Sequence, residues 1–291
     1  MTDWFACMCE GRFADAWAVS DAVLAAGLWR DQRTLPRHQQ AIWDGTPIDG
    51  RRVLVRCYHG LGDTIQFVRY MPMLRARARD VILWTQPALL PLLSNAPGID
   101  RLLPLHDDVV DVAYDVDVEI MELPWLFRTT LETIPAVVPY LTPPRAVRTQ
   151  ATGKPRVGLA WRTGGWAPHR AISLRNLAPL WSVPASWHVL HERPGIGIAD
   201  LASEMMTLDL VITVDSMPAH LAGALGIPVW TLLPADADWR WMQDRDDSPW
   251  YPTMRLFRQE RAGEWRPVVE RVVGELAMRV YGSASQPLST A

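Results

Sequence analysis

Short apolar runs alternate with amphipathic and polar stretches along the chain, and the clearest example lies in its second half. Leu210–Val214 and Val229–Leu233 are rich in β-branched residues and are typical of strands buried on both faces. Between them, Ala219–Leu225 predicts a compact helix, Gly226 falls where helices commonly end, and Pro228 prevents continuation. The pattern predicts a strand–helix–strand unit of a parallel sheet.

Units of the same kind are expected on both sides of this segment. The further predicted strands are Arg52–Cys57, Val81–Thr85, Arg101–Pro104, a segment within 111–120 with one solvent-facing side, Arg156–Trp161 and Trp187–Leu190. The further predicted helices are Ile65–Ala78, Pro87–Leu93, Leu174–Trp181, Ile198–Met206 and Glu264–Tyr281. Alternating strands and helices predict an α/β protein with doubly wound parallel sheets.

A break in this alternation divides the chain. Leu141–Pro155 is rich in Pro, Thr and basic residues and is typical of a linker. We therefore expect two Rossmann-like domains, at 42–145 and 155–263, that face a common cleft, rather than one continuous sheet. A terminal helix over 264–281 and a disordered Ser/Gly/Pro tail over 282–291 are expected to follow.

The first 35 residues predict a helical hairpin, with helices at Trp4–Glu10 and Phe13–Ala26 and a turn at Gly11. Its pattern resembles the second half of a tetratricopeptide repeat. Because such repeats need neighbours to be stable, this hairpin is expected to pack on the main body or on a partner.

Composition excludes several function classes. A net charge of −3 and a pI of about 6.2 argue against non-specific nucleic-acid binding and against a polybasic membrane anchor. No apolar run approaches the roughly 20 residues that span a bilayer, and the N-terminus lacks the pattern of a signal peptide. The three cysteines form no disulfide framework. A cytoplasmic protein is expected.

Two strand-to-helix turns carry candidate chemistry. Asp215 and Ser216 stand where the helix after Leu210–Val214 begins, so that its free N–H groups would face a crevice and suit a phosphate. Gly60 and Gly62 lie between a strand and a helix, where glycine permits close approach of a ligand. The alternative for either turn is an ordinary structural unit without a ligand.

Four longer blocks carry a resemblance. They are HGLGDTIQFVRYMPML (59–74), VGLAW (157–161), DLVITVDSMPAHLAGALGIPVW (209–230) and DWRWMQDRDDSPWYPTMRLFRQ (238–259). The chain resembles glycosyltransferase family 9, the heptosyltransferase-like enzymes of the GT-B fold, from about residue 42 to 275. The resemblance is closer to the transferase domain that follows tetratricopeptide repeats in many bacterial proteins.

The resemblance implies roles for particular residues. Asp63 matches the general base of these inverting enzymes, which deprotonates the acceptor hydroxyl; the alternative is a helix N-cap. The residues implied to bind the donor's diphosphate and nucleotide are Arg162, Thr163, His169, Arg170, Asp215, Ser216, Met217 and His220. The base or ribose would meet His191 and Glu192, and the sugar Asp238 and Trp239. Trp250 and Tyr251 are expected in the core.

The favoured function is a metal-independent, inverting transfer of a hexosyl or heptosyl group from a nucleoside-diphosphate sugar to an acceptor hydroxyl. Cations and a helix N-terminus would carry the diphosphate charge, so no metal and no cofactor are expected. The alternatives are a catalytically silent binding or scaffold module and a sugar-nucleotide epimerase on the same fold. The acceptor is open, and a homodimer is conceivable.

Overall fold

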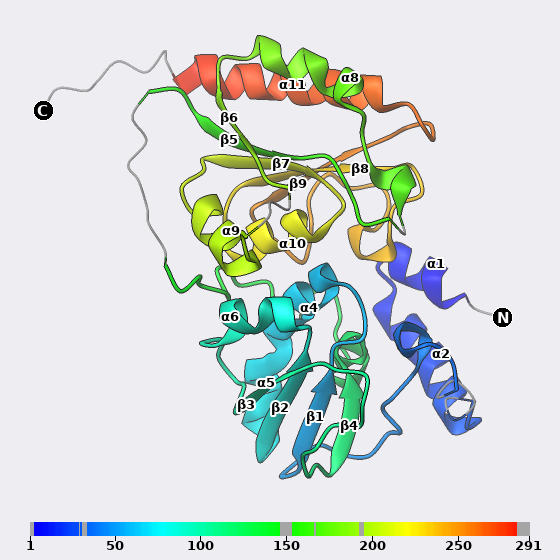
Figure 1. The fold of residues 1–291 in the computed structure, drawn as a ribbon. Helices are drawn as coiled ribbons and strands as arrows, with labels where there is room; N and C mark the ends of the chain where they lie inside the picture. Colours follow the sequence, from blue (N-terminus) through cyan, green and yellow to red (C-terminus); the bar gives the residue numbers. More distant parts are fainter. Residues whose placement is uncertain are drawn as a thin grey trace, which may run out of the picture.

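The computed structural model describes residues 3–28, 30, 34–145, 153–165, 167–191 and 195–283. They form two parallel sheets, one of four strands and one of five, which lie one above the other in Figure 1. We call residues 34–145 the N half and the part from residue 153 the C half; the N-terminal helices before residue 30 belong to neither half. The predicted α/β architecture with two parallel sheets is confirmed. No helix of the described residues is long and apolar enough to cross a membrane.

The N half is built on four parallel strands in the order β3-β2-β1-β4. These strands are β1 (Arg52–Arg56), β2 (Asp80–Thr85), β3 (Arg101–Pro104) and β4 (Val116–Glu119). The inner strands β1 and β2 are almost entirely buried because their continuous apolar runs are covered on both faces. Of the segment predicted within 111–120, only its last part pairs in the sheet.

The long helix predicted over Ile65–Ala78 is divided and begins earlier. The structure has α4 (Leu61–Phe67), a 3-10 turn at Val68–Tyr70 and then α5 (Met71–Arg77). Pro72 in the first turn of α5 has no N–H to donate to the preceding turn, which accounts for the break. The remaining helical elements of the N half are η1 (Arg37–Gln39), η3 (Pro87–Leu89), α6 (Leu90–Leu93), η4 (Ile120–Glu122) and α7 (Leu123–Leu126).

The C half has five parallel strands in the order β6-β5-β7-β8-β9. They are β5 (Arg156–Ala160), β6 (Ser186–Val189), β7 (Leu210–Val214), β8 (Val229–Leu233) and β9 (Met254–Arg258). The sequence had not indicated β9, whose apolar residues alternate with arginines at the sheet edge. Both strands of the central predicted unit, β7 and β8, are confirmed and fully buried.

Helices cover both faces of the C-half sheet (Figure 1). On one face lie α8 (Leu174–Leu177), η6 (Ala178–Ser182) and α11 (Trp265–Ser283); on the other lie α9 (Ile198–Met205) and α10 (Met217–Ala224). The short turns η5 (Pro168–Arg170) and η7 (Trp239–Trp241) follow β5 and β8. Residues 146–152 of the predicted linker and residues 284–291 of the predicted tail lie outside the described residues.

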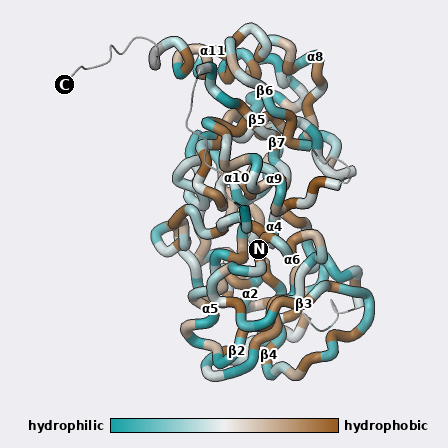
Figure 2. The backbone as a smooth tube through the Cα atoms, turned by 60° about the vertical axis from the view of Figure 1, so that its left-hand side comes forward, coloured by the Kyte–Doolittle hydropathy of each residue, from teal (hydrophilic) through white to brown (hydrophobic). Residues whose placement is uncertain are grey.

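The two halves pack directly on each other, with α9 and α10 above α4 and α6 in both Figure 1 and Figure 2. The buried guanidinium of Arg69 donates hydrogen bonds to the carbonyl of Trp250 and to the hydroxyl of Tyr140. It also lies 4.5 Å from the ring centroids of Tyr140 and Tyr251. Tyr140 belongs to the N half and Tyr251 to the C half. One apolar core runs through residues of both halves, so the halves form a single packed body.

The N-terminal helices α1 (Trp4–Cys9) and α2 (Phe13–Ala25) pack on this body and contact both halves. The ring of Trp4 lies 5.6 Å from that of Trp239 in the C half. The indole N–H of Trp17 donates to the carbonyl of Thr129 in the N half. Of the two expected places for the hairpin, the main body is the one that the structure shows; its likeness to a tetratricopeptide repeat stays a prediction.

Candidate functional site

A cavity of about 790 Å³ lies between the two halves, where several strands of both sheets end. Residues just after β1, β2, β4, β5, β6, β7 and β8 contribute to its wall. Ligands of open α/β sheets bind outside the carboxyl ends of the strands, and this cavity has that location in both sheets at once. It is therefore the leading candidate for a binding site.

The cavity brings together most of the residues singled out from the sequence. They are Gly60, Gly62, Asp63, Arg162, Thr163, Arg170, His191, Asp215, Ser216, Met217, His220, Asp238 and Trp239. His169 is exposed in η5 and does not line the cavity. Its expected contact with a diphosphate stays a prediction. Glu192 lies outside the described residues.

The N-terminus of α10 opens toward the cavity. Ser216 is its N-cap, with extended backbone, but the Ser216 hydroxyl donates to the carbonyl of Val214 and makes no capping bond to the helix. Pro218 occupies the first turn and has no N–H. The N–H of Ala219 donates to the carbonyl of Ser216, so the capacity of this helix end to bind an anion rests on the N–H groups of Ser216 and Met217.

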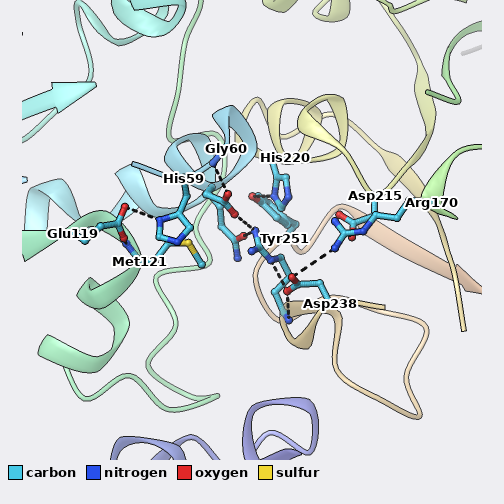
Figure 3. A network of polar contacts seen from close by, with 12 residues as sticks. His59, Gly60, Glu119, Met121, Arg170, Asp215, His220, Asp238 and Tyr251 are labelled. Atoms are coloured by element: carbon cyan, nitrogen blue, oxygen red, sulfur yellow. Dashed lines mark hydrogen bonds and ion pairs between the residues drawn. The ribbon is translucent and has the colours of Figure 1, made fainter. Parts of the chain in front are cut away.

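Five residues from both halves form a chain of alternating charges, which we call the charge chain (Figure 3). In order they are Asp63, Arg240, Asp238, Arg170 and Asp215. Arg240 is 2.6 Å from Asp63 and 2.8 Å from Asp238. Arg170 is 2.9 Å from Asp215 and 3.9 Å from Asp238. All five line the cavity, and together they hold three carboxylates against two guanidiniums.

Burial and pairing act differently on the members of the charge chain. Burial raises the pKa of Asp215, and the nearby Arg170 only partly offsets it. Burial would also raise the pKa of Asp238, but Arg240 outweighs that effect and the pKa is lowered. The pKa of Arg240 is raised because Asp238 and Asp63 outweigh its burial. Asp238 and Arg240 therefore stay charged, while Asp215 is more readily protonated than Asp238.

Asp63 is engaged at both carboxylate oxygens. It stands at the third position of α4, and Oδ2 accepts a 2.8 Å hydrogen bond from the N–H of Gly60, the N-cap residue. Oδ1 accepts a 2.6 Å hydrogen bond from Nη1 of Arg240. The expected alternative of an N-cap is wrong in position, since Gly60 is the N-cap, although Asp63 does help to cap the helix.

His220 is buried in α10, and its Nδ1 lies 3.0 Å from the hydroxyl of Tyr251. Its ring stacks on Trp241 at 5.3 Å. Burial, followed by the charges of Arg240 and Arg69, lowers the pKa of His220 well below 6.5. It is therefore neutral at physiological pH, and it reaches the cavity as a neutral hydrogen-bonding group.

Among the residues expected to bind the nucleotide, Arg162 is exposed, whereas the members of the charge chain are buried or half-buried. His191 follows β6, and its ring meets Trp161 edge to face with centroids 4.1 Å apart. Burial and the charge of Arg162 lower the pKa of His191. His191, Thr163 and the exposed Arg162 line the C-half side of the cavity, and Trp161 supports the ring of His191 from behind that wall.

The aromatic residues after β8 are mostly structural. Trp250 and Tyr251 are fully buried, as expected for the core. Trp239 borders the cavity but is itself buried, stacked near Phe67 and in contact with Trp4. The expected sugar contact of Trp239 is thus limited to the part of the ring that reaches the cavity.

Sequence reasoning gave no role to three residues that the structure places in the cavity wall: Arg240, His59 and Gln86. His59 is oriented by the buried carboxylate of Glu119, which lies 3.0 Å from its Nδ1. Burial alone would lower the pKa of His59, but Glu119 outweighs it and the pKa is raised. The sequence did contain a signal for Arg240, which stands between two tryptophans and could therefore be expected to be buried. A buried arginine needs a carboxylate partner, which would have pointed to an ion pair.

The described residues contain no group of three or more His, Cys, Asp or Glu that is arranged to hold a metal ion. The charge chain alternates in sign, so its carboxylates already face guanidiniums instead of converging on a cation site. What the cavity offers is an anion-binding helix end and arginines on one side, with Asp63 and His59 on the other.

Comparisons with solved structures identify the fold. The glycosyl transferase family 9 structure from Veillonella parvula matches 80% of this chain and 99% of its own, with a TM-score of 0.53 and 13% identity. The ADP-heptose LPS heptosyltransferase II of E. coli matches 80% of this chain and all of its own, with a TM-score of 0.51 and 13% identity. The chain thus has the two-sheet α/β fold of these glycosyltransferases.

The chain is also similar to a further solved heptosyltransferase and, in sequence, to one curated protein. TibC of enterotoxigenic E. coli, an iron-containing dodecameric heptosyltransferase solved with ADP-D-β-D-heptose, covers 84% of this chain and 80% of its own, with a TM-score of 0.50 and 12% identity. Protein FlbA of Caulobacter vibrioides is 25% identical over 329 aligned positions. That alignment covers 91% of this chain, which spans about half (52%) of the length of FlbA. No protein-family model matches.

Proposed function

We propose that the chain is an inverting, metal-independent glycosyltransferase that moves a sugar from a nucleoside-diphosphate sugar to an acceptor hydroxyl. The observation that supports it most is the cavity itself. It is lined on the C-half side by arginines and by the N-terminus of α10, and on the N-half side by Asp63. A diphosphate leaving group needs positively charged groups and hydrogen-bond donors, and a hydroxyl that loses its proton needs a carboxylate base.

Each part has one task in this reaction. Arg162, Arg170 and the N-terminus of α10 at Ser216 and Met217 hold the diphosphate, and neutral His220 donates a hydrogen bond to it. The acceptor oxygen attacks the anomeric carbon while its proton passes to Asp63. The bond from that carbon to the diphosphate breaks, and the diphosphate leaves with the electron pair. Asp238 and the accessible part of Trp239 contact the sugar.

Adenosine diphosphate is the first nucleotide to test, because two of the solved relatives carry ADP-heptose in their names. His191 would contact the base or the ribose. The acceptor is left as a hydroxyl compound that fits the N-half side of the cavity. Cations and backbone N–H groups take the place of a metal ion in this proposal.

The test begins with thermal unfolding in the presence of ADP, UDP, GDP, CDP and dTDP, each with and without Mg²⁺. A ligand at 100 times its Kd stabilises by about 2.7 kcal/mol, which a melting curve resolves easily. We expect one of the five diphosphates to raise the melting temperature more than the others do. The rise should be the same with and without Mg²⁺. No response to any of the five would favour the silent binding module instead.

Turnover then separates the remaining alternatives. The matching nucleotide-sugar is incubated with and without candidate acceptors, and the released diphosphate is measured. Transfer predicts release that depends on the acceptor, whereas an epimerase would change the donor without any acceptor. Asp63→Asn is expected to lower transfer roughly 10²-fold or more, the usual contribution of a general base. Full transfer by this variant would refute Asp63 as the base.

A further inference from the structure

Both arginines of the charge chain are paired with carboxylates of the protein itself. Arg170 faces Asp215 and Asp238, and Arg240 faces Asp238 and Asp63. Because the chain holds three carboxylates and two guanidiniums, its formal charge is negative. A diphosphate that enters the cavity must therefore compete with a carboxylate for each of these guanidiniums.

Arg240 is the member of the chain that joins the two halves. Its Nη1 donates both to Oδ1 of Asp63 and to Oε1 of Gln66, at 2.6 Å and 2.9 Å. Its Nε and its backbone N–H both donate to Oδ1 of Asp238. The side chain is only 8% exposed, yet it forms part of the cavity wall. It thus connects the proposed base in α4 with a residue of the proposed sugar site after β8.

This contact holds the proposed base against a cation. Oδ1 of Asp63 accepts from Arg240 and Oδ2 accepts from the N–H of Gly60, and each oxygen keeps a second lone pair for a proton. A proton that passes to Asp63 neutralises the carboxylate, however, and Arg240 then loses this counter-ion. An anion that takes over the pairing with Arg240 would offset that loss.

We propose that Arg240 is a positioning residue that couples proton uptake by Asp63 to the binding of a nucleoside diphosphate. The diphosphate pairs with the guanidinium of Arg240 and so replaces the negative charge that Arg240 loses when Asp63 accepts the hydroxyl proton. Donor binding and base activation are then one exchange of ion pairs. This inference rests on the proposed function and adds to it a control of the same site.

The test measures affinity, because the competition predicts an effect in an unusual direction. Binding of ADP, or of whichever diphosphate stabilises the protein, is measured by titration calorimetry with the full chain and with Asp63→Asn. Asparagine keeps the volume and can still accept from the N–H of Gly60, but it no longer competes for Arg240. We expect Asp63→Asn to bind the diphosphate roughly threefold to tenfold more tightly while its transfer activity is lost.

The matched control is Asp117→Asn. Asp117 forms a 2.6 Å ion pair with Arg56 in the same sheet, but it does not line the cavity. This variant removes the same negative charge from the N half, so it corrects for the loss of long-range repulsion of the anion. Its affinity for the diphosphate is expected to match that of the unmodified chain.

The outcomes separate the two proposals. Unchanged or weaker binding by Asp63→Asn, with normal binding by the unmodified chain, would overturn the control by Arg240 and leave the transferase standing. Absence of diphosphate binding by the unmodified chain would overturn both. If the melting curve shows that Asp63→Asn does not fold, Asp238→Asn releases Arg240 from its other carboxylate, and the same tightening is required of it.

Discussion

A Cβ atom added at Gly62 in α4 would lie 2.7 Å from Cδ2 of His220 in α10. This is closer than side chains approach one another, so the two helices meet at a distance that glycine alone permits. We expect Gly62→Ala to displace His220 and to destabilise the fold by about 1–3 kcal/mol, the usual cost of overpacking. Denaturant unfolding measures this cost.

The control for that substitution is Gly274→Ala in α11, where an added Cβ meets nothing within 4 Å. Alanine there is expected to stabilise by roughly 0.5–1 kcal/mol, since glycine is unfavourable inside a helix. Equal effects of the two substitutions would contradict the close contact between α4 and α10.

The buried arginine between the halves gives a second prediction. Arg69→Lys keeps the charge but cannot reach the carbonyl of Trp250 and the hydroxyl of Tyr140 together. A loss of about 2–4 kcal/mol in the free energy of unfolding is expected, because buried partners lose their hydrogen bonds. For comparison, Arg77→Lys alters an exposed pair with Asp49 and should cost less than about 1 kcal/mol.

His220 predicts loss of stability in acid. Its pKa is well below 6.5 in the folded protein, so the unfolded chain binds the proton more readily and stability falls as pH drops below about 6.5. Between pH 7.5 and 5.5 the loss from this group is on the order of 1 kcal/mol. Unfolding of the unmodified chain and of His220→Gln at both pH values isolates it: the variant should lack this part of the acid sensitivity.

His59 should act with the opposite sign. Its folded pKa is raised by Glu119, so its ion pair contributes stability below the unfolded pKa of about 6.5 and loses it as pH rises through the folded value. The effect should stay below about 1 kcal/mol because the imidazole is partly exposed. His59→Gln should reduce stability at pH 5.5 more than at pH 8; an equal loss at both values would mean that the imidazole is not charged in the fold.

The sequence predicted the fold well wherever local pattern decides structure. The buried strands β7 and β8 and the helix between them have unbroken apolar runs and clear end signals, and all three are confirmed. The edge strand β9 escaped prediction because arginines interrupt its apolar residues. Hydrogen bonding to β8 stabilises β9 as a strand, and this contact is not visible in the local sequence.

Much of the candidate site was also accessible, since residues after parallel strands gather at one end of a sheet. The charge chain was not, because Asp63 and Arg240 are 177 positions apart and meet only through the packing of the two halves. The contact between Trp239 and Trp4 was likewise not predictable, because the two residues are far apart in the sequence. Local sequence identifies such residues as polar or aromatic, but it does not give their partners.

The N-terminal helices have a consequence for how a ligand enters. The carbonyl of Cys9 accepts from the N–H of Gln243 in the C half, and Asp21 accepts from the indole of Trp125 and pairs with Arg128 in the N half. The hairpin therefore ties the two halves together, and spreading them apart would break these contacts at once. We accordingly expect a bound ligand to change ionic partners within the cavity more than it changes the relative position of the halves.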